Sequence, residues 1–289
     1  MQQRSVGDWL LFTILAFIWG SSFILMKEGL HELTAYQVAA IRMLSAGLVL
    51  LPFSLRNVGS LSRKQLLFIV LSGVLGSFIP AILFCVAETR IDSALAGMLN
   101  ALTPLFVIGV GALFFSVKTK WHKVAGVVTG FAGMVLLFLS QLQQSSGTHL
   151  FYASLVALAT ACYGLNVNLV NRYLHQTASL QIAAVSFTVL LLPSLLVLQL
   201  DGFFRLPLTR ARIWSIGAAS VLGVLGTALA TILFYRLMKR AGPLFSSMVT
   251  YGIPFVALFW GIVAGETVTL LQLTGLLVIL GGVYLANRQ

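Results

Sequence analysis

The second half of this chain repeats the first half at an offset of 150 residues, and the polar loop inside the repeat reverses its charge. Residues 73–76, Gly-Val-Leu-Gly, recur as residues 223–226. The loop at residues 88–92 is net acidic, whereas its counterpart at residues 238–242 carries only basic charges. Basic loops of membrane proteins stay on the cytoplasmic side. Matched loops of opposite charge therefore predict two repeats that are inserted upside down relative to each other.

The hydropathy of the chain places both repeats in a bilayer. Its mean hydropathy is +0.99, with 59% hydrophobic and 9% charged residues, which is typical of polytopic membrane proteins. A helix that crosses the hydrocarbon core needs about 20 apolar residues. We therefore expect an all-α membrane protein with ten transmembrane helices, at roughly residues 8–27, 35–55, 66–87, 93–114, 122–140, 150–171, 179–200, 212–236, 243–263 and 269–287.

The expected helices divide evenly between residues 1–140 and residues 150–289, which a polar segment at residues 141–149 joins. A repeat of five helices begins and ends on opposite sides of the membrane, so its copy must be inverted. Inverted repeats are typical of secondary transporters, whose substrate site lies at the repeat interface near the bilayer midplane. The sequence thus predicts two inverted five-helix repeats around a central cavity.

The net charge of +11 does not indicate a nucleic-acid partner, because the basic residues are divided among short loops between helices. In a ten-helix count most of them fall on one side, which is therefore predicted to be cytoplasmic, with both termini inside. The loop at residues 201–212 departs from this rule, because three arginines lie there on the opposite side. The predicted cytoplasmic charges are Arg4, Arg56, Arg63, Lys64, Lys118, Lys120, Lys123, Arg172, Arg236, Lys239, Arg240 and Arg288.

Neutral polar and aromatic residues inside the helices are the candidates for substrate binding. A single such side chain more often makes a helix–helix hydrogen bond, but here six helices contribute to the set. Neutral donors and acceptors with aromatic walls suit a small, neutral or zwitterionic, partly apolar metabolite. The candidates are Trp19, Ser22, Phe23, Phe78, Asn100, Thr103, Tyr163, Asn166, Thr227, Thr231 and Tyr251.

Lys27 and Arg42 are candidate ionisable residues, near the outer ends of the first two helices. An ionisable residue inside a membrane is a functional hypothesis by default. The alternative is that these side chains extend to the nearby surface or pair with Glu28. No basic cluster marks a site for a sugar phosphate, and no deep acidic residue marks a sodium or proton site.

Pro104 and Pro254 occupy equivalent positions in the two repeats and are the candidates for gating. A proline within a helix removes the hydrogen bond to the carbonyl four residues earlier, here that of Asn100 or Thr250. Such weakened turns either line a cavity or are simple packing kinks. If they are hinges, inverted symmetry predicts that Pro104 gates the cytoplasmic side and Pro254 the outer side.

The sequence argues against an enzyme. All four histidines fall in or near loops without metal-ligand spacing, so we expect neither a metal nor a cofactor. Neither an intramembrane protease motif nor a phosphate-binding loop of the Walker type is present, which excludes ATP-driven pumping within this chain.

The segment Phe17–Phe23 followed by Lys27 resembles the first-helix signature of EamA-type members of the drug/metabolite transporter superfamily. The Ile41-Arg42-Met43 segment, the two prolines and Gly265-Glu266 resemble further features of that family. The resemblance implies ten helices, with a cavity formed by the first, third, fourth, sixth, eighth and ninth. It also implies transport of small metabolites, frequently export of amino acids or related compounds.

The reading that these observations favour is an inner-membrane secondary transporter that moves a small neutral or zwitterionic metabolite by alternating access. Its expected partners are that metabolite and the lipid bilayer. The alternative is a passive channel or a membrane receptor that does not transport. The sequence leaves open the identity of the substrate, the direction of transport, protons as a coupling ion, and the oligomeric state.

Overall fold

The computed structural model describes residues 5–117, 120–144 and 148–287, and their regular secondary structure is entirely helical. Arg4, Lys118, Arg288 and residues 145–147 of the predicted linker lie outside the described residues. The α-helices of the described residues are α1 (Val6–Leu30), α2 (Ala35–Asn57), α3 (Arg63–Gly73), α4 (Ile79–Ala87), α5 (Ser93–Asn100), α6 (Thr103–Phe114), α7 (Trp121–Gln144), α8 (Thr148–Tyr173), α9 (Ser179–Val189), α10 (Leu191–Leu200), α11 (Arg210–Val221), α12 (Ala230–Ala241), α13 (Pro243–Ser247), α14 (Ile253–Val263) and α15 (Leu270–Asn287).

Within the described residues, nine helical segments are long and apolar enough to cross a membrane. A shorter apolar helix covers Leu270–Ala286, which is most of α15. Large apolar side chains such as Leu113 and Phe255 are exposed to 79% and 61%, as expected for positions that face lipid. The chain is therefore a multi-pass helical membrane protein, as its hydropathy predicts.

The first helices begin at side-chain caps that the sequence encodes locally. Ser5, Thr34 and Ser62 each accept a hydrogen bond from the backbone three residues later. The side chain at that later position, which is Asp8 in α1, accepts a hydrogen bond from the backbone N–H of the cap residue. These reciprocal bonds satisfy backbone donors that the first helical turn leaves open.

Short π segments interrupt two of the membrane-length helices. η2 (Val74–Phe78) separates α3 from α4, and η4 (Leu222–Leu229) separates α11 from α12. Both segments contain the repeated Gly-Val-Leu-Gly motif or most of it. π turns widen a helix locally and recur at functional sites.

The two equivalent prolines do not lie within a continuous helix, and this corrects the expectation of a mid-helix position. Pro104 lies in the first turn of α6, and Pro254 in the first turn of α14. Residues 101–102 and the 3-10 turn η5 (Met248–Tyr251) precede these helices. Proline is tolerated at a helix start because its missing N–H would have no partner there. The Thr103 hydroxyl donates to the carbonyl of Asn100 at 2.8 Å.

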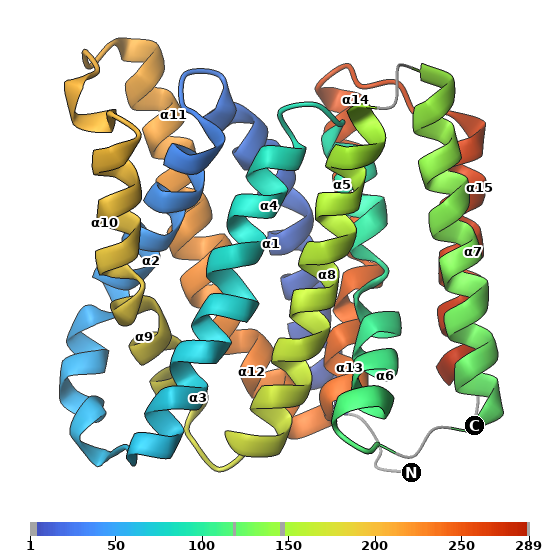
Figure 1. Cartoon of the computed structure of the whole chain (residues 1–289), viewed down its shortest axis with the longest axis horizontal. Coiled ribbons are helices and arrows are strands. Elements are labelled where there is room, and N and C mark those ends of the chain that lie inside the picture. The colour runs from blue at the N-terminus through green and yellow to red at the C-terminus, as the bar shows by residue number, and fades with distance from the viewer. Residues whose placement is uncertain (1–4, 118–119, 145–147, 288–289) are drawn as a thin grey trace.

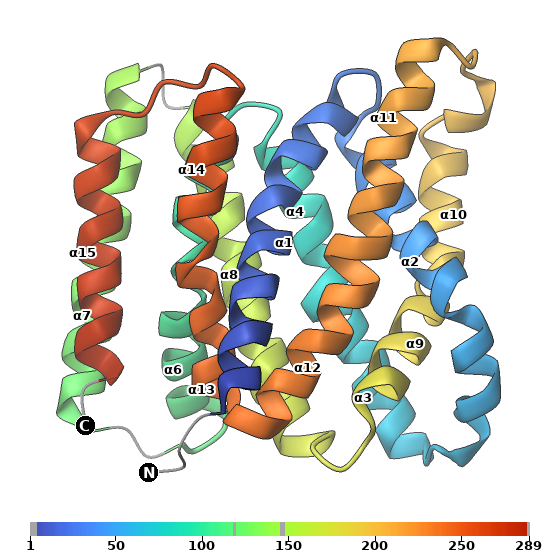
Figure 2. The same cartoon turned by 180° about the vertical axis from the view of Figure 1, so that it is seen from behind.

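The loops gather at two faces of the helical bundle. Loops at residues 31–34, 88–92 and 264–269 lie at what we call the upper face, and loops at residues 58–62 and 174–178 at the lower face (Figure 1). The first helix begins at the lower face and α15 ends there (Figures 1 and 2). Such alternation is what a bundle of antiparallel membrane helices requires.

The helices α7 and α15 form a pair at one edge of the bundle (Figure 2). Glycines let their backbones come close. A Cβ atom on Gly126 would lie 2.4 Å from the carbonyl oxygen of Gly282, and one on Gly133 would lie 2.7 Å from that of Gly275. Small residues at such spacings drive association in lipid through close packing.

Candidate functional site

A cavity lies inside the bundle. It is bordered by the π segments η2 and η4 and by two broken helices, α5 with α6 and α13 with α14. The space open to the centres of water molecules is about 100 Å³, which is several times the space that a single water needs. A small metabolite would occupy such a space. The lining residues are Trp19, Ser22, Phe23, Met26, Arg42, Gly76, Ser77, Phe84, Asn100, Thr103, Tyr163, Asn166, Val167, Gly226, Thr227, Thr231, Phe234, Tyr235, Ser247 and Thr250.

Most of the candidate binding residues line this cavity. Two of them, Phe78 and Tyr251, do not belong to the lining, although both lie in segments next to it. The lining residues that were missed include Gly76 and Gly226, which occupy equivalent positions in the repeated motif. That equivalence was the signal that could have identified them. The candidates in the lining are Trp19, Ser22, Phe23, Asn100, Thr103, Tyr163, Asn166, Thr227 and Thr231.

Three buried polar side chains form a closed network on one side of the cavity. Ser72 Oγ donates to Asn166 Oδ1 at 2.7 Å, and Asn166 Nδ2 donates to Tyr235 Oη at 3.2 Å. Tyr235 and Ser72 are 2.9 Å apart, and because the Ser72 proton is engaged by Asn166, Tyr235 donates in this pair. The network joins α3, α8 and α12 and fixes the orientation of Asn166 beside the cavity.

Aromatic side chains form other parts of the wall. The rings of Phe23 and Phe84 meet at 5.8 Å between centroids, and those of Phe84 and Tyr163 at 6.1 Å. The ring centroids of Trp19 and Phe234 are 5.2 Å apart. The Trp19 indole donates to the carbonyl of Gly226 at 3.0 Å, and thereby attaches α1 to η4.

Arg42 brings a positive charge to the cavity wall. It is 9% exposed, and its Nε donates to the hydroxyl oxygen of Thr227 at 2.6 Å. Thr227 in turn donates to the carbonyl of Leu222 at 3.2 Å. The candidate ionisable residue Arg42 therefore lines the cavity and is buried within the protein.

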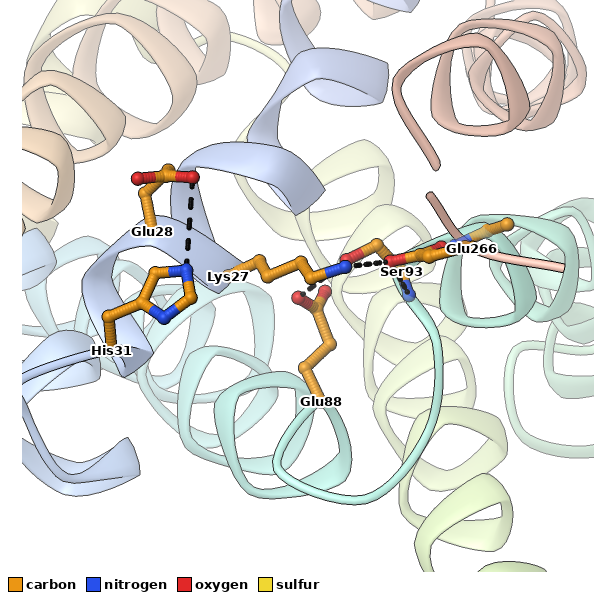
Figure 3. A network of polar contacts seen from close by, with 7 residues as sticks. Lys27, Glu28, His31, Glu88, Ser93 and Glu266 are labelled. Atoms are coloured by element: carbon orange, nitrogen blue, oxygen red, sulfur yellow. Dashed lines mark hydrogen bonds and ion pairs between the residues drawn. The ribbon is translucent and has the colours of Figure 1, made fainter. Parts of the chain in front are cut away.

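Lys27, the other candidate ionisable residue, lies outside the cavity in a polar cluster at the upper face (Figure 3). Its Nζ is 2.8 Å from Glu266 Oε1. The two Glu266 carboxylate oxygens accept from the backbone N–H groups of Ser93 and Ala94 at 3.2 and 3.0 Å. The cluster thus connects α1, the loop before α15 and the N-terminus of α5, where a carboxylate is favourable.

The alternative pairing of Lys27 with Glu28 is wrong. Glu28 accepts from the Trp214 indole at 3.0 Å and lies 3.9 Å from His31. In Figure 3 it lies away from Lys27, which extends toward Glu266. The partner that the structure provides, Glu266, is distant in sequence, so no local pattern pointed to it.

Glu88 completes the cluster at the upper face (Figure 3). It is partly exposed as a residue, but its Oε1 is shielded from solvent and has no hydrogen-bond partner among the described residues. Burial raises the pKa of Glu88 well above its usual value, and the charge of Glu266 raises it further. A hydrogen bond from Ser93 and the charges of Lys27 and Arg42 act in the opposite direction. Glu88 is therefore the acidic side chain of this cluster that is best placed to hold a proton.

No cluster of three or more histidine, cysteine or acidic residues that could hold a metal ion occurs in the part of the chain that the structure describes.

Comparison with known proteins identifies the family. The EamA-like transporter family model matches the chain twice, at residues 7–139 and 150–288. A Salmonella typhimurium protein named "Probable amino-acid metabolite efflux pump" is 27% identical over 96% of this chain and 94% of that protein. The Escherichia coli K12 "Uncharacterized inner membrane transporter YedA" is 25% identical over 94% of this chain and 88% of its own length.

A Streptantibioticus cattleyicolor protein named "Probable terminal-alkyne amino-acid exporter" is 24% identical over 94% of this chain and 90% of its own. One solved crystal structure covers 98% of both chains with a TM-score of 0.66 at 17% identity, a likeness that shows the fold alone. The helical membrane fold, the central cavity and the two family-model matches lead to one assignment. The chain belongs to the EamA-like transporter family and is a membrane transporter, not an enzyme.

Proposed function

We propose that this protein is a secondary transporter that exports a small amino-acid-like metabolite across the inner membrane by alternating access. The observation that supports the proposal is the cavity that the π segments η2 and η4 border. Its walls combine aromatic rings with polar groups. Relatives named as an amino-acid metabolite efflux pump and an amino-acid exporter favour the same substrate class and direction.

The proposed architecture is ten transmembrane helices in two inverted five-helix repeats, residues 1–140 and 150–289, with α15 as the tenth. The π segments η2 and η4 fall near equivalent positions of the repeats, and so do the helix starts at Pro104 and Pro254. Pseudo-symmetry of this kind supplies two nearly equivalent states, one open to each side.

Contacts at both ends of α1 support alternating access. At the upper face Lys27 pairs with Glu266 at 2.8 Å, and at the lower face Arg240 Nε lies 3.1 Å from Asp8. Trp9 packs edge-on against Phe245 beside this lower ion pair, at 5.2 Å between ring centroids. We propose that opening toward one side breaks the contacts at that end while the other end stays closed.

Flux measurements in proteoliposomes test the proposal. The probe is L-leucine, whose apolar tail and polar head suit a cavity lined by aromatic rings and polar groups. A transporter gives saturable uptake and counterflow of labelled leucine against an internal leucine load. A channel gives flux that neither saturates nor shows counterflow, and a receptor gives binding without flux. Either of the latter results contradicts the proposal.

A pair of matched variants connects flux to the cavity. Thr231→Phe adds bulk to a lining residue and is expected to reduce counterflow at least about tenfold, equivalent to ~1.4 kcal/mol. Leu229→Phe makes a similar change two residues earlier, at a side chain that is 42% exposed. It should leave flux near the parent value. Equal loss of flux in both variants would argue against the cavity as the substrate site.

A further inference from the structure

Arg42 differs from every other lining residue because it alone carries a fixed charge in the cavity wall that the structure describes. It is 9% exposed and lies on α2, well within the Ala35–Arg56 membrane segment. Charged side chains at such positions are expensive and are kept where they serve a function. A buried charge of this kind needs hydrogen-bond acceptors or an opposite charge nearby.

The protein itself compensates it only in part. A guanidinium has five N–H donors in a planar fork, and the one on Nε is engaged by Thr227. The described residues provide no further hydrogen bond and no ion pair to the Arg42 guanidinium. The charge of Arg42 acts to lower the pKa of Glu88. Glu88, however, belongs to the cluster at the upper face with Lys27 and Glu266 (Figure 3). The terminal N–H groups thus remain for a ligand.

The packing around Arg42 holds the guanidinium in place. Because Arg42 Nε can only donate, the Thr227 oxygen accepts from it, and the Thr227 proton goes to the Leu222 carbonyl. The π segment that carries Thr227 lies against the backbone of α2. A Cβ atom on Gly223 would lie 2.4 Å from the carbonyl oxygen of Arg42. An oriented guanidinium loses less conformational entropy when it binds an anion, and its paired N–H groups match a carboxylate.

We infer that the Arg42 guanidinium binds the carboxylate of the transported molecule, and that this carboxylate is required whereas an α-amino group is not. The inference rests on the proposed transport function and narrows its substrate class to small apolar monocarboxylates. No lining residue in the described chain is acidic. An ammonium would therefore meet only neutral acceptors such as Asn100 and Thr250, beside a cation that repels it. The rings of Phe23 and Phe84 remain for an apolar tail.

Four compounds with the same branched tail separate these requirements. They are L-leucine, 4-methyl-2-oxopentanoate (carboxylate without amine), L-leucinamide (amine without carboxylate) and isopentylamine. Binding to the purified protein is measured by calorimetry at pH 7. Leucine and the oxo acid should bind within about tenfold of each other. The amide and the amine should bind at least about 30-fold more weakly, as expected when one partner of a buried charge pair is missing.

Variants assign the effect to Arg42. Arg42→Gln should reduce leucine binding to the level of leucinamide, and Arg42→Lys should retain part of the preference for carboxylates. Arg205→Gln is the matched control, because Arg205 is an exposed arginine in η3 (Phe203–Arg205). It should bind all four compounds as the parent does. If Arg42→Gln does not fold, Thr227→Val removes the hydroxyl that orients Arg42, and should weaken leucine and oxo-acid binding severalfold without affecting the amide.

Three results would overturn the inference: leucinamide binding as tightly as leucine, parent affinity for leucine in Arg42→Gln, or no binding of any of the four compounds at millimolar concentration. The transport proposal is tested separately by counterflow. Saturable leucine counterflow without discrimination against the amide overturns the role of Arg42 alone. Selective carboxylate binding without counterflow overturns transport alone.

Discussion

At the scale of single residues, Glu88 links the cluster at the upper face to pH. Burial and Glu266 raise its pKa, so the folded protein holds the Glu88 proton more tightly than the unfolded chain does. The contribution of Glu88 to the free energy of unfolding is fully present below the pKa of the unfolded chain, near 4.5. It is lost as pH rises through the raised pKa of the folded protein. Glu88→Gln should therefore match the parent Tm near pH 4.5 and exceed it at pH 8. Thermal unfolding in detergent across that range measures the effect, and parallel profiles of parent and variant would contradict it.

Glu266 is the residue that holds the upper end of α1. Its side chain is 3% exposed, whereas that of Lys27 is 34% exposed. Glu266→Gln removes the ion pair but leaves an amide oxygen for the N–H groups of α5, so we expect a loss of about 1–3 kcal/mol of stability. The cavity should also become more accessible from the upper face. Labelling of Thr231→Cys by an impermeant thiol reagent, with Cys85 and Cys162 replaced by alanine, reports this. Unchanged labelling would contradict a role for the ion pair in closure.

At the scale of helices, the pairing of α7 with α15 depends on backbone contact. Gly133→Ala places a methyl group 2.7 Å from the Gly275 oxygen and the Ile279 nitrogen. Backbone atoms cannot move aside as a side-chain end can, so we expect a loss of about 1–3 kcal/mol. Gly281→Ala is the control within α15, because its Cβ meets no atom within 4 Å, and it should be neutral or stabilising. Thermal unfolding of both variants compares them. Equal Tm values would show that the close contact is not needed.

The broken helices give a second prediction at this scale. Because Pro104 and Pro254 each begin a helix, replacement by alanine costs no hydrogen bond and should change stability by less than about 1 kcal/mol. Alanine also allows α5 to join α6, or α13 to join α14, as one stiffer helix. We expect slower leucine exchange in both variants, with Pro104→Ala restricting the cytoplasmic side and Pro254→Ala the outer side. Thiol labelling from each side tests this, and equal labelling in both variants would exclude the gating role.

At the scale of the whole molecule, the inverted topology predicts which loops face the cytoplasm. Reporter tags at residues 63–64, at Lys120 and at residues 239–240 should appear inside, and tags at residues 88–92 and 141–149 outside. The physical reason is the retention of basic loops on the cytoplasmic side. Finding residues 239–240 outside would contradict the inverted repeat. A tag at Arg205 is informative as well, because the arginines of that loop depart from the charge rule.

The sequence alone determined the features that depend on local composition. Runs of apolar residues set the helices, because a bilayer leaves the backbone no other partner for its hydrogen bonds. The repeat at a fixed offset identified the prolines and the glycine motifs, and the polar inventory identified nine of the residues that line the cavity. Each of these can be read from the order of residues along the chain, without knowing how the helices pack.

Only the tertiary structure decided which groups meet. Lys27 and Glu266 are separated by 239 positions, and Arg42 and Thr227 by 185. Helical periodicity tells which residues share a face, but it does not tell how each helix is rotated against its neighbours. That rotation follows from close packing of small residues and polar pairs across helices. It leaves Phe78 and Tyr251 outside the lining and directs the charge of Arg42 into the cavity.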